Sequence, residues 1–84
     1  MVNNSTQIDL FPRIEKLICR QIGSDIALTL ETDLLTDLAI DSLELVELGL
    51  KIEKEFGKKL PTPELRRCIT VGEVIELTQQ TVFA

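Results

Sequence analysis

Ser42 is the side chain of this 84-residue sequence best placed for covalent chemistry. A serine at a helix start is most often a cap, whose hydroxyl accepts a backbone hydrogen bond. Here Asp41, with Glu44 three residues later, matches the reciprocal capping box, which makes Asp41 the cap and Ser42 the first helical residue. The Ser42 hydroxyl is then free to face solvent, and a phosphate ester on it would lie beside free N–H groups at the positive end of the helix dipole. The residues alone leave both roles open for Ser42, helix cap and site of modification.

Other kinds of reactive site find little support in the sequence. The chain contains no histidine to serve as a base or a metal ligand, which disfavours a hydrolase or a metalloenzyme. Cys19 and Cys68 have neither the number nor the spacing of a zinc site, and we expect half-buried thiols without a chemical role. Asp33, Asp37 and Asp41 suggest calcium, but a spacing of four residues without a central glycine differs from a calcium loop. The residues therefore disfavour a hydrolase, a metalloenzyme and a defined metal site.

Two longer helices and the loop between them are predicted to position Ser42. Asp9 can cap the first helix, with Pro12 in its first turn, where a missing N–H costs little, and Gly23 at its end. The second helix runs over about residues 41–56 and starts at the capping box. Between them, residues 24–40 hold leucines spaced too irregularly for one helix, so we expect a loop that places leucines in the core.

Two further helical segments follow. Thr62 can cap a short helix that has Pro63 at its first position and ends near Arg67. Thr70 and Glu73 form another capping box, for a last helix that ends near residue 80. The sequence thus predicts an all-α fold, a small four-helix bundle of three longer helices and one short helix, with a long loop between the first two.

The second helix is expected to carry two apolar faces. At about 100° per residue, its apolar side chains fall into two stripes on nearly opposite sides. The core stripe consists of Leu45, Leu48, Ile52 and Phe56, and the outer stripe consists of Leu43, Val46 and Leu50. Because a small bundle buries one side of such a helix, the outer stripe either meets a partner or is covered by the long loop. Glu47 lies inside the outer stripe and suits a partner helix that carries Arg or Lys.

Composition and charge further limit the kinds of protein that this sequence can encode. An apolar content of 44% argues against disorder, and no apolar run reaches the roughly 20 residues that span a bilayer. The first residues lack the basic flank and apolar stretch of a signal peptide, so we expect a cytoplasmic protein without membrane contact. We also expect a monomer. The net charge of −5 is unfavourable for nucleic-acid binding. We expect residues 1–8 to form a flexible N-terminus and residues 9–82 to form the single domain that this length allows.

Asp41-Ser42-Leu43, followed by Glu44 and by Val46-Glu47-Leu48, resembles the attachment motif and second helix of acyl carrier proteins. Further similar residues are Phe56, Leu60-Pro61, Thr70 to Val74 and, in the first helix, Ile14 to Gly23, so that the likeness covers about residues 14–77. Ala39-Ile40 stand where members usually have a glycine followed by a small or apolar residue, and Glu44 stands where carriers of fatty acid synthesis usually have Asp. The segment after Glu55 is also more basic than in those carriers. These departures leave the transferase and the pathway open.

The resemblance implies a function and a set of partners. A phosphopantetheinyl transferase would attach phosphopantetheine from coenzyme A to Ser42, and the arm would hold an acyl group as a thioester for enzymes of fatty acid or polyketide biosynthesis. The carrier itself would catalyse nothing. Synthase, acyltransferase and related enzymes with basic docking surfaces would bind the residues around the arm, namely Asp41, Leu43, Glu44, Val46, Glu47 and Leu50.

Two alternatives stay open from the sequence. An unmodified helical adaptor would share the caps and the two-faced helix, and it predicts that Ser42 can be replaced by alanine without loss of function. Gly49, on the inner side of the second helix, indicates either close packing of helices or room for a guest acyl chain.

Overall fold

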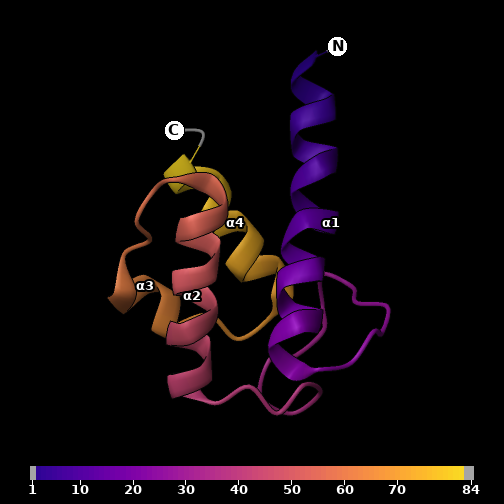
Figure 1. Ribbon diagram of the computed structural model, residues 1–84, viewed down its shortest axis with the longest axis vertical. Helices are drawn as coiled ribbons and strands as arrows, with labels where there is room; N and C mark the ends of the chain where they lie inside the picture. Colours follow the sequence, from indigo (N-terminus) through magenta and orange to yellow (C-terminus); the bar gives the residue numbers. More distant parts are fainter. Residues whose placement is uncertain (1, 83–84) are drawn as a thin grey trace.

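The structure, a computed structural model, describes the backbone of residues 2–82 and the side chains of residues 10–82. Four helices make up this part of the chain: α1 (Val2–Ile22), α2 (Ser42–Phe56), α3 (Thr62–Arg66) and α4 (Val71–Val82). α2 packs against α1 and α3, and α4 packs against the same two helices (Figure 1). The predicted all-α bundle of three longer helices and one short helix is confirmed. None of the described helices is long and apolar enough to cross a membrane.

The start of α1 differs from the sequence prediction. The helix continues through Asp9, and Pro12 lies inside it, so Asp9 is not the helix cap. Leu10 gives a physical reason: its side chain is buried and lies one turn before Ile14, and helical geometry ahead of Pro12 brings Leu10 onto the same buried stripe. Met1 and the side chains of residues 2–9 lie outside the described residues, and the flexibility expected for residues 1–8 stays a prediction.

The capping box at the start of α2 is confirmed. The backbone N–H of Glu44 donates to Asp41 Oδ1 at 2.9 Å, and the backbone N–H of Asp41 donates to Glu44 Oε1 at 3.3 Å. At the other end, Gly57 stops the helix with a φ of 74°, in the left-handed region where glycine is favoured. Local sequence therefore fixes both ends of α2.

The two later helices show one correction and one confirmation. Pro61, not Thr62, is the cap of α3, because the buried Leu65 donates its backbone N–H to the Pro61 carbonyl and starts the helix one residue earlier. Pro63 is consequently its second residue, and the helix ends at Arg66. At α4 the expected box is present, with the Glu73 backbone N–H donating to Thr70 Oγ1 at 3.2 Å.

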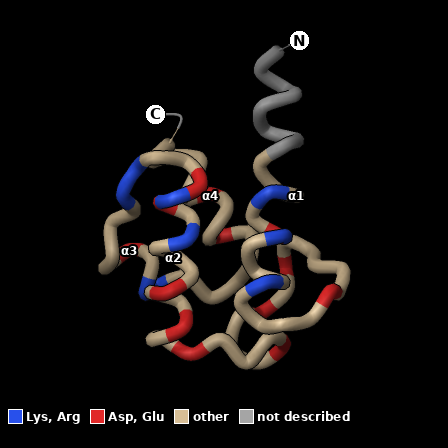
Figure 2. Tube along the Cα trace, viewed as in Figure 1, with Lys and Arg blue, Asp and Glu red and all other residues tan. Residues whose placement is uncertain are grey.

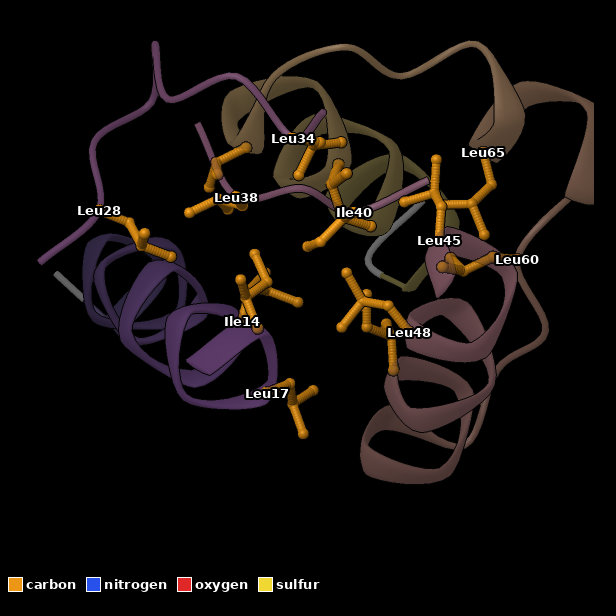
Figure 3. Packing of buried hydrophobic residues seen from close by; sticks show 14 of the residues in the cluster. Ile14, Leu17, Leu28, Leu34, Leu38, Ile40, Leu45, Leu48, Leu60 and Leu65 are labelled. Atoms are coloured by element: carbon orange, nitrogen blue, oxygen red, sulfur yellow. The ribbon is translucent and has the colours of Figure 1, made fainter. Parts of the chain in front are cut away.

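The loop between α1 and α2 contributes to the core as expected. Its buried side chains are those of Leu28, Leu34, Leu38 and Ile40, which point toward Ile14 and Leu48 (Figure 3). Three backbone hydrogen bonds join the loop to the residues around the start of α4. They run from Leu34 N to Ile69 O at 2.8 Å, from Val71 N to Thr32 O at 2.9 Å and from Gly72 N to Leu30 O at 2.9 Å. The loop is thus held by contacts with distant segments and not by periodic structure of its own.

Gly49 allows α2 and α3 to pack closely. It is buried, and a methyl group in its place would overlap Leu65 Cδ2 from α3. Leu65 itself is buried and lies next to Leu45 at this end of the core (Figure 3). Of the two roles left open for Gly49, the structure supports close helix packing, because a side chain of the protein already fills the space beside it.

Candidate functional site

Ser42 is exposed at the first position of α2. Since the Asp41 carboxylate accepts the capping hydrogen bond from Glu44 N, the Ser42 hydroxyl is not required for the cap. An exposed serine hydroxyl at the start of a 15-residue helix can take an ester-linked phosphate without disturbing a buried group. The residues present therefore fit a prosthetic group attached through a phosphodiester.

The two apolar stripes of α2 have different surroundings. Leu45, Leu48 and Ile52 are buried, and Phe56 packs partly buried against the same core. On the other side, Leu43 is 68% exposed and Leu50 57% exposed, with the partly buried Val46 between them. The loop between α1 and α2 therefore does not cover the outer stripe, which leaves an apolar surface directly beside Ser42.

Charges surround this outer stripe unevenly. Figure 2 shows acidic positions along the loop and the first half of α2, and basic positions toward the other end of α2 and the segment after it. Asp41 and Glu47 are exposed, and Glu44 is partly buried. A surface of this kind attracts a partner with basic side chains to the end of α2 that carries Ser42.

Gln21 of α1 contacts the outer surface of α2, which sequence reasoning missed. Its amide Nε2 donates to Glu47 Oε1 at 3.2 Å, and Lys51 Nζ donates to its Oε1. Gln21 thus joins an acid and a base one turn apart on α2 and fixes Glu47 against α1. No local sequence pattern predicts this contact, because Gln21 and Glu47 are 26 residues apart in the chain.

A pocket of about 490 Å³ lies beside Ser42. Three segments meet there: loop residues 33–36, the start of α2 with the residues just before it, and the end of α3 with the connection after it, which contributes Arg66, Cys68 and Ile69. Leu35 and Ile69, which line it, are 62% and 60% exposed. The third segment was absent from the residues expected near Ser42, because only the packing of α3 on α2 brings it there.

Two aspartates suggested for calcium instead stabilise the loop. Asp33 Oδ1 accepts hydrogen bonds from the backbone N–H groups of Leu35 at 2.9 Å and Thr36 at 2.8 Å. Asp37 Oδ2 accepts from Asp33 N at 2.8 Å. The hydrogen bonds from Thr36 lower the pKa of the Asp33 carboxyl below its usual value, because they favour the ionised form. The carboxylates of Asp33 and Asp37 therefore stabilise the turn of the loop next to the pocket.

Cys68 lines the same pocket but is a poor nucleophile. Burial raises the pKa of its thiol to about 11, and the carboxylates of Glu73 and Glu76 add to the increase. At neutral pH the sulfur therefore stays protonated, and it donates a hydrogen bond to the Glu64 carbonyl at 3.6 Å. The half-buried position expected for Cys68 is confirmed, and the absence of a chemical role stays a prediction.

Comparison with known proteins decides the family. Residues 12–78 match the family model described as "Phosphopantetheine attachment site". The acyl carrier protein of Saccharopolyspora erythraea is 41% identical over 75 residues, which cover 88% of this chain and 79% of that protein. The acyl carrier proteins of Helicobacter acinonychis and Thermotoga maritima are 34% and 33% identical, over 89% and 86% of this chain and 97% and 90% of their own lengths.

The chain belongs to the acyl carrier protein family. As a member, it is a carrier and not an enzyme, and its prosthetic group is phosphopantetheine. Members of the family interact with enzymes of synthesis and with the transferase that loads them, and this chain shares that role. The resemblance noted around Ser42 is thereby confirmed for the family, the fold and the prosthetic group.

Proposed function

We propose that this acyl carrier protein holds acyl groups on a phosphopantetheine arm attached to Ser42 and presents them to enzymes of fatty acid or polyketide biosynthesis. The observation that carries the proposal is the position of Ser42, exposed at the first turn of α2 while Asp41 makes the cap. When bound, the arm supplies a thiol that keeps an acyl group activated as a thioester. The residues around it orient the arm and bind its partners.

The proposed partner surface is the outer stripe of α2 with its carboxylates. It consists of Asp41, Leu43, Glu44, Val46, Glu47 and Leu50. The exposure of Leu43 and Leu50 supports this assignment, because apolar side chains that no part of the described chain covers are available to a partner. The carboxylates favour the basic docking surfaces expected of a transferase, a synthase or an acyltransferase. We propose that the chain works in this way as a cytoplasmic monomer, with residues 9–82 as its carrier domain.

Intact mass after incubation with a broad-specificity phosphopantetheinyl transferase and coenzyme A tests the attachment. The wild-type protein should gain the mass of one phosphopantetheine, and Ser42→Ala should gain none. Ser24→Ala is a matched control, because Ser24 is also exposed but lies in the loop after α1, and this variant should be loaded like the wild type. Loading of Ser42→Ala, or a wild type that stays unmodified with several transferases, would instead favour an unmodified adaptor.

A further inference from the structure

The pocket beside Ser42 contains one feature that the proposed function leaves unused, the side chain of Arg66. Arg66 is the last residue of α3 and lines this pocket together with Ser42, although 24 positions separate them in the chain. Its side chain is exposed at the rim. Among the described residues that line the pocket, Arg66 is the one base, whereas Asp33 and Asp41 are acids. A cation thus lines the same pocket as the hydroxyl proposed to carry a phosphodiester.

An anion on Ser42 would need such a cation. Asp41 precedes Ser42 directly and lines the pocket, as does Asp33, so a phosphodiester there would share the pocket with two carboxylates. Like charges within a few ångströms of each other repel, and the exposed position reduces that repulsion without removing it. Arg66 is the group in the pocket that can offset it.

The chemistry of the side chain favours phosphate as its ligand. A guanidinium presents N–H donors in a planar fork that matches two oxygens of a phosphate group, and it stays charged at every physiological pH. Within residues 10–82 Arg66 forms no ion pair with a carboxylate, in contrast to Arg13, whose Nη2 lies 2.9 Å from Glu55 Oε2. The guanidinium of Arg66 is therefore available to a new partner.

We propose that Arg66 is a positioning residue that binds the phosphodiester of the phosphopantetheine arm on Ser42. The contact directs the start of the arm toward the pocket between the loop, α2 and the residues after α3, whose rim carries the exposed Leu35 and Ile69. This inference rests on the proposed attachment at Ser42. It adds a specific residue, distant in the sequence, that governs where the arm begins its path.

The test compares Arg66→Ala with Arg67→Ala, each as the unloaded and the fully loaded protein. Arg67 is the matched control, because it is the adjacent exposed arginine and lines a different pocket, beside Glu73 and Glu76. Full loading is first verified by intact mass and by mapping the arm to Ser42. The readouts are the ³¹P chemical shift of the phosphodiester and the difference in melting temperature between the loaded and unloaded forms.

If Arg66 binds the phosphodiester, Arg66→Ala changes the ³¹P shift, whereas Arg67→Ala leaves it at the wild-type value. The loaded form of Arg66→Ala should also lose about 2–4 °C of melting temperature relative to its unloaded form when compared with the wild-type pair. Arg66→Lys should restore part of both effects, because lysine keeps the charge but lacks the planar fork.

Two results would overturn the inference while leaving the proposed function intact. One is a ³¹P shift that is the same in the loaded wild type, Arg66→Ala and Arg67→Ala. The other is an equal loss of stability in the loaded and unloaded forms of Arg66→Ala, which would mean that Arg66 only offsets Asp33 and Asp41. A protein that gains no mass at Ser42 would overturn the proposed function, and the inference with it.

Discussion

The inner and outer faces of α2 are similarly apolar in sequence, but in the fold the inner face is buried and the outer face is largely exposed. Leu48 on the inner face is fully buried, whereas Leu50, two residues later, is 57% exposed. The inner face packs against α1, α3 and the loop, and the outer face lies beside Ser42 with carboxylates around it. The inner apolar face therefore contributes to stability, and the outer one is the surface that we propose for recognition. Four predictions test this division.

The largest effect is expected from truncating the two leucines in parallel. Leu48→Ala removes a fully buried side chain and leaves a cavity, so it should lower the free energy of unfolding by about 2–5 kcal/mol. Leu50→Ala makes the same chemical change on the outer face and should alter it by less than about 0.5 kcal/mol. Urea unfolding followed by circular dichroism measures both values. Equal losses would show that the outer face is also part of the packed core.

A second prediction concerns recognition by the outer face. Val46→Asp places a charge in the centre of the apolar surface, and Glu47→Lys reverses a charge that would attract a basic partner. Each should slow loading by a transferase by about tenfold or more while the melting temperature stays near that of the wild type.

The control for this prediction is the double change of Lys58 and Lys59 to alanine, in the exposed turn after α2, which should have a mild effect on loading. If the double change alone abolishes loading, the basic segment is the docking surface. A loss of folding in Val46→Asp would instead assign Val46 to the core.

The third prediction tests the contact of the inner face with α3. Gly49→Ala gains about 1 kcal/mol of helix propensity but forces a methyl group against Leu65, at a cost of about 1–3 kcal/mol. The variant should therefore be less stable than the wild type by about 1 kcal/mol in thermal or urea unfolding.

A double-mutant cycle sharpens this third prediction. In a Leu65→Ala background the obstructing side chain is gone, so the same Gly49→Ala change should be neutral or stabilising. If its effect has the same sign and size in both backgrounds, the side chain of Leu65 is not the reason for glycine at position 49.

The smallest effect on stability is expected from Ala39, in the loop just before α2. Ala39 has a φ of 58°, in the left-handed region that costs a residue other than glycine about 1 kcal/mol or more. Ala39→Gly should relieve this strain and, after the entropy lost by glycine on folding, raise the stability by up to about 1 kcal/mol. Ala27→Gly, at an exposed position earlier in the same loop, should be destabilising by about 0.5–1 kcal/mol. Differential scanning calorimetry compares the two, and a destabilised Ala39→Gly would contradict the strain argument.

Local sequence determined the parts of this protein that depend on residues three or four positions apart. The capping boxes at Asp41 and Thr70, the glycine that ends α2 and the two stripes of α2 all follow from helix geometry, which repeats every 3.6 residues. The position of Ser42 as first helical residue follows from the same local pattern. For this reason the place of Ser42 at the start of α2 could be predicted from the sequence. The caps predicted at Asp9 and Thr62 were wrong, because tertiary contacts of the buried Leu10 and Leu65 extend their helices.

Only the tertiary structure decided which residues surround α2 and Ser42. It left the outer stripe of α2 exposed instead of beneath the loop, set Leu65 against Gly49, and brought Arg66 to the pocket of Ser42. Gln21 reaches Glu47 in the same way, from another helix. These contacts join residues 16 to 26 positions apart, and their formation depends on how whole helices pack, so no periodicity along the chain encodes them.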